Sequence, residues 1–421
     1  MYQEHVLDNG LRILLVPMDN FQSVSVGVFV KIGSRYEAEN LSGISHLIEH
    51  LLFKGTPRRP TAKLIAEAIE GIGGVSNAYT SQETTVYYAK VAANQASTAI
   101  DVLADLIRHP LFEPAELEKE RYIIGEEINM MFDSPEDWVS VLLDQIIWPD
   151  HPLGRDIAGT HASLTGLRQN HVLSFYQSGY HPRNMLIAVG GAFEAAEIVA
   201  EINELLGTWQ PASIPTFEPA PTVQNKPCYL VENRPIEQGH LTLALPALPR
   251  THPDRYALSV LNAVLGEGMS SRLFLRVREE EGLAYAVDSG LNLLADTGSL
   301  VVYAGVDAER GTEALQAILE ELSRLRDDPV PETELNKARE YLKGRLVLGL
   351  EDSFSQTAWV ASQALLMERV KTPAEVLEAY DAITVADVQA IAQKIINPAR
   401  YSLAAVGPFG EGAALGKLLT G

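Results

Sequence analysis

The chain has 421 residues, 46% of them hydrophobic, and this length predicts two or more domains with sizeable cores. Its formal net charge of −22 argues against nucleic acid as a partner, because phosphate binding needs a basic surface. The single cysteine, Cys228, excludes an internal disulfide, and no apolar run reaches membrane-spanning length, so we expect a cytoplasmic protein with no membrane contact.

Two strands are predicted near the start of the chain. The dipeptide Asn9-Gly10 is typical of a hairpin turn, and residues 12–17 after it read as a strand. From Val24 to Val30, valines alternate with other residues, which is typical of a half-buried strand.

Residues 44–52 are predicted to form a helix that carries two histidines and a glutamate. The apolar residues of this segment recur at helical spacing and form one stripe: Ile44, Leu47, Ile48, Leu51 and Leu52. On another side of the helix, His46 and His50 lie one turn apart, as two zinc ligands on one helix must, and Glu49 can activate a bound water. The order His-x-x-Glu-His is a metallopeptidase signature. On the pentapeptide alone, an exposed polar face that happens to carry two histidines is an equally good interpretation.

A third zinc ligand is expected on a second helix, predicted at residues 114–131. Glu120 and Glu127 lie two turns apart on one face of this helix, and Glu126 points about a quarter turn away. Catalytic zinc usually takes three protein ligands and leaves one position for water. The pair therefore suits one ligand and one supporting carboxylate, although a solvated acidic stripe is the commoner fate of such glutamates.

The chain divides at a proline-rich stretch, residues 211–227, which is predicted to be an extended linker. Both flanking halves show the same order of predicted elements, which indicates an internal duplication. In the first half these elements are residues 24–30, 44–52, 85–91, 96–108 and 114–131; in the second they are residues 241–245, 256–265, 299–306, 311–326 and 331–350. Runs of strands followed by runs of helices predict an α+β fold with mostly antiparallel sheets, in two homologous domains at 1–210 and 228–421.

The second half lacks the candidate metal ligands. Aligning the two halves by eye replaces His46, Glu49, His50, Glu120 and Glu127 by other residues. The corresponding positions are, in order, Ser259, Asn262, Ala263, Ala338 and Arg345. The loss affects both segments together, as expected if they jointly serve one metal.

Nearly the whole chain resembles the family of pitrilysin, insulin-degrading enzyme and mitochondrial processing peptidase, and specifically its short two-domain members. The resemblance is carried by residues 7–11 (LDNGL), 33–35 (GSR), 43–56 (GISHLIEHLLFKGT), 77–80 (NAYT), 120–128 (ERYIIGEEI) and 151–155 (HPLGR). It implies that each half is a sheet with helices packed on one face.

The resemblance also implies roles for the candidate site residues. His46, His50 and Glu127 would bind one Zn²⁺ per chain, with Glu49 as the general base and Glu120 as the outer partner of a ligand. Glu126 is the fallback third ligand if the register is off by one.

Substrate-binding residues are expected in both halves. The glycines before Ser76 suggest an accessible sheet edge, to which a peptide could add as a strand, and the resemblance implies this role for Asn77 and Ala78. An ordinary strand is the alternative.

In the second half, Arg278 and Tyr285 look like the family's pair that holds the substrate and hydrogen-bonds the scissile carbonyl. The alternatives are an ion pair of Arg278 with neighbouring glutamates and a buried aromatic ring for Tyr285.

The motif and the resemblance together predict a zinc-dependent endopeptidase, and the resemblance implies that it hydrolyses unfolded peptides or presequences inside a chamber. The resemblance implies a pair of subunits, either a homodimer or a heterodimer with a related subunit, in which Arg278 and Tyr285 come from the partner. Two alternatives remain: a catalytically silent subunit or scaffold, and a processing enzyme for one dedicated presequence.

Overall fold

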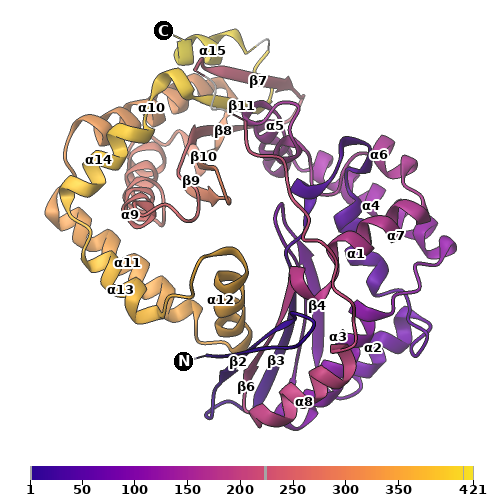
Figure 1. The fold of residues 1–421 in the computed structure, drawn as a ribbon. Coiled ribbons are helices and arrows are strands. Elements are labelled where there is room, and N and C mark those ends of the chain that lie inside the picture. Colours follow the sequence, from indigo (N-terminus) through magenta and orange to yellow (C-terminus); the bar gives the residue numbers. More distant parts are fainter. Residues whose placement is uncertain (1, 222–224, 411, 421) are drawn as a thin grey trace. The chain divides into compact units, whose positions relative to one another are not determined.

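The computed structural model describes residues 2–221, 225–410 and 412–420, and they form two compact units of three chain segments each (Figure 1). Unit 1 contains Met1–Asn129, Arg155–Glu218 and Leu348–Lys371. Unit 2 contains Met130–Gly154, Pro219–Val347 and Thr372–Gly421.

Unit 1 is built on a mixed sheet with the strand order β1-β2-β6-β3-β5-β4. Its strands are β1 (Gln3–Val6), β2 (Arg12–Pro17), β3 (Ser23–Val30), β4 (Val75–Thr80), β5 (Thr85–Ala92) and β6 (Met185–Gly191). β2 and β6 run parallel, and the other neighbours run antiparallel. The predicted hairpin joins β1 to β2, with Gly10 at a φ of 87° that favours glycine.

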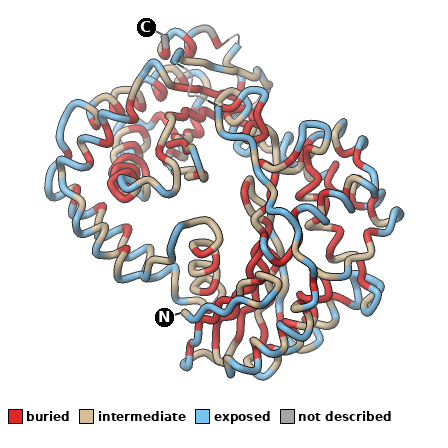
Figure 2. Tube along the Cα trace, viewed as in Figure 1, coloured by how far each residue is buried: buried red, intermediate tan, exposed pale blue. Residues whose placement is uncertain are grey.

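Helices cover one face of this sheet and enclose the core of unit 1. They are α1 (Ile44–Leu52), α2 (Ala62–Glu70), α3 (Ala96–Arg108), α4 (Pro114–Asp133, which leaves the unit after Asn129), α6 (His161–Gly166), α7 (Gln169–Gly179) and α8 (Ala195–Leu206). The sheet contributes Val26 and Val28 to the core, and α1 and α3 contribute Leu47 and Leu103, all with at most 1% of their surface exposed. Figure 2 shows that buried residues gather on the strands of the sheet.

A further helix, α12 (Ser353–Leu366), covers the opposite face of the same sheet. Phe29 of β3 packs with Ala361 of α12, and the hydroxyls of Ser25 and Ser353 lie 2.9 Å apart. The expectation of a half-buried strand at residues 24–30 is therefore wrong. This strand is buried on both faces because α12 covers the face that carries Ser25 and Phe29. Ser353 of α12 lies 328 residues after Ser25 in the chain.

Unit 2 repeats the topology of unit 1 with the strand order β7-β11-β8-β10-β9. Its strands are β7 (Cys228–Asn233), β8 (Gln238–Pro246), β9 (Ala284–Leu293), β10 (Gly298–Asp307) and β11 (Ser402–Gly407). β7 and β11 run parallel, as β2 and β6 do, and the other neighbours run antiparallel. The sequence of strand positions and directions matches β2-β6-β3-β5-β4, which supports the duplication.

The helices of unit 2 also lie on both faces of its sheet. They are α5 (Pro135–Ile147), α9 (Arg255–Leu265), α10 (Gly311–Asp327), α11 (Glu332–Gly349, which extends past the unit at Leu348), α13 (Pro373–Asp381), α14 (Val385–Ile395) and α15 (Ala413–Thr420). Leu142 of α5 packs with Ala244 and Val406 of the sheet, so a helix from the first half of the chain covers this sheet, just as α12 covers the first sheet.

The predicted fold class, α+β with two homologous halves, is confirmed. Residues 211–221 contain no helix or strand, in agreement with a linker, and residues 222–224 lie outside the described residues. The domain boundaries at 210 and 228 stay a prediction. In the part of the chain that the structure describes, no helix is long and apolar enough to cross a membrane.

Candidate metal centre

Helix α1 has an apolar side that faces the core of unit 1 and a polar side that carries the candidate ligands. Leu47 and Ile48 are fully buried, whereas His46 and His50 keep about a fifth of their side-chain surface exposed. The two imidazole rings lie edge to face with their centroids 4.6 Å apart. The apolar stripe thus fixes the rotation of the helix and brings both rings to the same side.

Helix α4 places Glu127 next to both imidazoles. Leu117 and Ile124 are buried against the core and fix the face that α4 presents to α1. The Oε2 atom of Glu127 lies 3.8 Å from Nε2 of His46 and 3.8 Å from Nε2 of His50. One ligand atom from each of these three residues lies within 4.8 Å of the others.

Glu120, two turns before Glu127, lies behind His50. Its Oε2 is 3.0 Å from Nδ1 of His50, and its Oε1 is 2.8 Å from Nζ of Lys54. A hydrogen bond from Nδ1–H to this carboxylate leaves Nε2 of His50 with a free lone pair on the side of Glu127. Lys54 holds the other oxygen of Glu120, so the orientation of the His50 ring is fixed from behind.

The two histidines differ in their electrostatic surroundings. Burial, together with the charge of His50, lowers the pKa of His46 to about 4. Burial also lowers the pKa of His50, but the Glu120 hydrogen bond and the nearby carboxylates outweigh it, and the net pKa is raised above 6.5. Of the two imidazoles, His50 is therefore the one that takes up a proton first as the pH falls.

Glu49 points toward the end of β4, where Thr80 Oγ1 donates a hydrogen bond to Glu49 Oε2 at 2.5 Å. Burial raises the pKa of Glu49, and the bond from Thr80 acts in the opposite direction. No role for Thr80 was predicted from the sequence, although this residue closes the motif of residues 77–80. Its position at the end of an edge strand was the available signal.

Glu126, the fallback ligand, is exposed and accepts a weak hydrogen bond from Asn129 Nδ2 at 3.4 Å. It is absent from the group of residues around His46 and His50. The structure therefore favours Glu127 over Glu126 as the third ligand.

The three residues fit a zinc ion. Zinc bonds of about 2.0–2.2 Å in a tetrahedral arrangement place ligand atoms roughly 3.4 Å apart. The 3.8 Å separations from Glu127 to the two imidazoles are slightly wider, so small movements of side chains would close the set. Two imidazoles and one carboxylate also form a donor set of known catalytic zinc sites.

Asn77 and Ala78 lie on β4, at the edge of the first sheet. Their strand pairs with β5 on one side, and no strand of the described residues pairs with its other side. The side chain of Asn77 accepts a hydrogen bond from the backbone N–H of Ala78 at 2.8 Å. The expected accessible edge is present, and peptide binding there stays a prediction.

Arg278 and Tyr285 belong to unit 2. Arg278 lies in the π-helical turn η6 (Phe274–Glu280), with its guanidinium 4.8 Å from the Phe274 ring and 5.4 Å from the Tyr285 ring. Its ion pair with Glu279 is long, at 3.8 Å. Tyr285 is 75% exposed, so the alternative of a buried aromatic ring is wrong.

Two protein-family models together match most of the chain. Residues 12–161 match the insulinase family, peptidase family M16, and residues 167–342 match a model described as the inactive domain of peptidase M16. The second match agrees with the loss of the candidate ligands from the second half.

Curated relatives and solved structures extend the match over the full length. An uncharacterized zinc protease of Mycobacterium leprae is 36% identical, over 98% of this chain and 93% of the relative; one of Bacillus subtilis is 35% identical, over 98% and 99%. The fold is similar to a protease from Helicobacter pylori, with a TM-score of 0.90 and 22% identity over 97% of this chain and 99% of that chain. It is also similar to a chain of complex III2 from Candida albicans, with a TM-score of 0.84 and 20% identity over 97% and 96%.

The fold and site define a duplicated α+β protein with one inverted His-x-x-Glu-His motif. The chain belongs to peptidase family M16, the insulinase family, and to its single-chain, two-domain bacterial type. The predicted family is thereby confirmed.

Proposed function

We propose that this protein is a zinc-dependent endopeptidase with its metal held by His46, His50 and Glu127. The observation that carries the proposal is the convergence of these three ligand atoms from two helices within 4.8 Å. The names of the relatives, zinc proteases, support the same metal and the same class of reaction.

A bound zinc ion supplies a Lewis acid that polarises a peptide carbonyl and lowers the pKa of water. Glu49, next to His50 in the chain, accepts the proton of the attacking water and returns it to the leaving amine. Thr80 holds one oxygen of Glu49, which leaves the other oxygen for the water. Glu120 keeps the imidazole of His50 in the tautomer that the metal needs.

The substrate proposed is an unfolded peptide or a presequence. A peptide that adds to β4 as a further strand would bond to the backbone around Asn77 and Ala78 and run past Thr80 and Glu49. In a homodimer, or in a heterodimer with a related subunit, Arg278 and Tyr285 of a second chain would bind the peptide and the oxygen of the scissile carbonyl. The exposure of Tyr285 supports this role.

Replacing Glu49 by glutamine tests the chemistry. Glu49→Gln should keep about one zinc per chain and lose about 10²–10⁴-fold in cleavage of a fluorogenic peptide, because the general base is gone and the ligands remain. Glu70→Gln, an exposed glutamate at the end of α2, is the matched control and should cleave normally.

Full activity in Glu49→Gln, or cleavage that persists without zinc, would contradict the proposal. A wild-type protein that binds zinc but cleaves no peptide would instead point to the silent subunit.

A further inference from the structure

We propose that buried Glu37 is a positioning residue, which fixes the start of α1 and thereby sets the zinc affinity of the centre. This inference rests on the proposed metal site. It gives a role to two stretches that carry the family resemblance but contribute no group to the chemistry. These are residues 33–35, which lie just before Glu37, and residues 151–155, which end at Arg155.

The Glu37 carboxylate takes the place of a helix cap on α1. Its Oε2 accepts the backbone N–H of Gly43, and its Oε1 accepts that of Ser45, both at 2.8 Å. The first N–H groups of a helix have no partner within the helix and carry its positive end, so they favour the ionised form of Glu37 as their acceptor. Burial acts in the opposite direction and raises the pKa of Glu37 to about 7. α1 receives no capping hydrogen bond from the residue before it, Gly43, which has no side chain.

The bond to Ser45 acts directly beside the metal ligand His46. Glu37 is only 3% exposed, so water cannot replace the carboxylate if it is removed. α1 has nine residues, and His46 is the third of them. A displacement of its first turn therefore moves one imidazole relative to Glu127 on a different helix.

The chain around this cap leaves little room for adjustment. Gly43 has a φ of 91°, and a Cβ atom there would lie 2.5 Å from the carbonyl oxygen of Ala158. The path into α1 is thus fixed by close backbone contacts on one side and by the Glu37 carboxylate on the other.

Arg155 holds the backbone of Glu37, and Arg35 fixes the chain two residues before it. Arg155 Nη2 donates to the backbone oxygen of Glu37 at 2.5 Å. Arg35, two residues earlier, is fully buried, pairs with Glu83 at 2.8 Å and lies over the Phe217 ring at 3.9 Å. These contacts fix the backbone of residues 35–37, and the side chain of Glu37 extends from there to the start of α1.

The test is the zinc dissociation constant of Glu37→Gln, measured on the full chain by competition with a chelator. Glutamine keeps the shape but turns an N–H donor toward one of the two helix N–H groups, so α1 loses one bond. We expect the dissociation constant to rise about tenfold or more, as for other residues that support metal ligands. Glu37→Asp keeps the charge but shortens the side chain. Its zinc dissociation constant should lie between those of the wild type and Glu37→Gln.

Glu321→Gln is the matched control, because Glu321 is a similarly buried glutamate that belongs to unit 2. It should lower the thermal midpoint without changing the zinc dissociation constant. If Glu37→Gln is only partly folded, the zinc-induced rise of the thermal midpoint serves as the readout and should be smaller than in the wild type at equal zinc.

Three outcomes separate the inference from the proposed function. Unchanged zinc affinity in both Glu37 variants would overturn the inference and reduce Glu37 to a structural residue. An equal loss of affinity in Glu321→Gln would do the same, because the effect would then be general destabilisation. A wild-type chain that binds no zinc would overturn the metal site itself.

Discussion

The two imidazoles of the metal centre differ in their partners, because His50 hydrogen-bonds the Glu120 carboxylate. As the pH falls, His50 should therefore be protonated before His46. The pKa of His50 is raised above 6.5 by Glu120 and the nearby carboxylates against the effect of burial, whereas the pKa of His46 is lowered to about 4. Zinc binds only the neutral imidazole, so protons compete with zinc at His50 below its raised pKa. Zinc affinity should thus fall as the pH drops through and below this value.

The measurement is the zinc dissociation constant between about pH 5 and 8, the range in which histidines titrate. At the acid end of this range the imidazoles should release about one proton per zinc, because His50 is protonated there and His46 is already neutral. Replacing Glu120 by glutamine should move the fall in affinity to lower pH. A release of two imidazole protons would contradict the assignment.

Thr80 should matter for the rate of cleavage rather than for substrate binding. Thr80→Val keeps the shape and removes the hydroxyl that orients Glu49. A hydrogen bond to a charged group contributes about 1.5–3 kcal/mol, so kcat should fall roughly ten- to a hundredfold with KM little changed. Steady-state kinetics of Thr80→Val and Thr80→Ser check this, since serine restores the hydroxyl. A valine variant with the wild-type kcat would remove Thr80 from the site.

Which site residues were predictable depends on how local their signal is. His46, Glu49 and His50 form one contiguous motif on one helix. Glu127 follows from its spacing to Glu120 only with the help of the family resemblance. Thr80 and Lys54 could not be assigned, because each acts on a side chain that folding brings near it and no spacing in the sequence records that contact.

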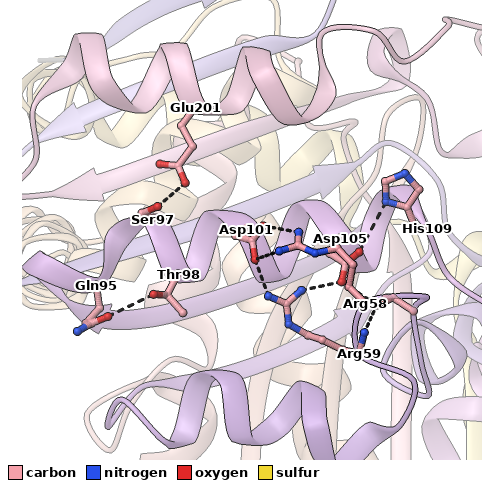
Figure 3. A network of polar contacts seen from close by, with 10 residues as sticks. Arg58, Arg59, Gln95, Ser97, Thr98, Asp101, Asp105, His109 and Glu201 are labelled. Atoms are coloured by element: carbon pink, nitrogen blue, oxygen red, sulfur yellow. Dashed lines mark hydrogen bonds and ion pairs between the residues drawn. The ribbon is translucent and has the colours of Figure 1, made fainter.

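At the scale of the element, the loop after α1 is fixed to α3 by a polar network around the buried side chain of Asp105 (Figure 3). Thr56 Oγ1 donates to Asp105 Oδ2 at 2.7 Å, and Arg59 pairs with Asp105 at 2.6 Å and with Asp101 at 2.5 Å. α1 is therefore held at its start by Glu37 and after its end by Asp105.

Removing the Asp105 carboxylate should destabilise unit 1. Asp105→Ala leaves Thr56 and Arg59 without their buried partner, and breaking such a pair costs about 3–5 kcal/mol. Thermal unfolding should show a clear drop of the midpoint. Ser97 lies on the same helix as Asp105 and makes an exposed hydrogen bond to Glu201. Ser97→Ala removes this bond and should shift the thermal midpoint little. Equal midpoints for the two variants would refute the anchoring role.

The elements that the sequence predicts are present in the structure, whereas their surroundings were not predictable. The apolar stripe from Ile44 to Leu52 predicts the helix α1, which ends at Leu52, shortly before the expected stop at Gly55, and residues 96–108 coincide with α3. The burial of β3 on its second face depends on α12, which lies too far along the chain for a local pattern to indicate. Alternation predicts that a strand is present, but not what covers it.

For the whole molecule, the repeated order of elements predicts two sheets of the same topology, and the structure has them. The placement of α5 and α12, each on the sheet of the other half of the chain, was not predictable. Each helix packs on strands that lie far from it in the sequence, and no local pattern records that contact.

The proposed pairing of subunits can be tested by mixing two inactive variants. Glu49→Gln lacks the base, and Tyr285→Phe lacks the hydroxyl. If each site combines the metal centre of one chain with Tyr285 of another, subunit exchange in the mixture creates one intact site per mixed dimer and restores cleavage. A mixture that stays inactive, although mass measurement shows mixed dimers, would contradict a shared site.

The most direct test of the central claim is zinc binding by Glu127→Gln compared with Glu126→Gln. The two glutamates are adjacent in α4, yet only Glu127 lies 3.8 Å from both imidazoles. We expect about one zinc per chain in the wild type and in Glu126→Gln, and strongly weakened binding in Glu127→Gln. Zinc bound equally well by Glu127→Gln, or lost in Glu126→Gln instead, would contradict the three-ligand centre.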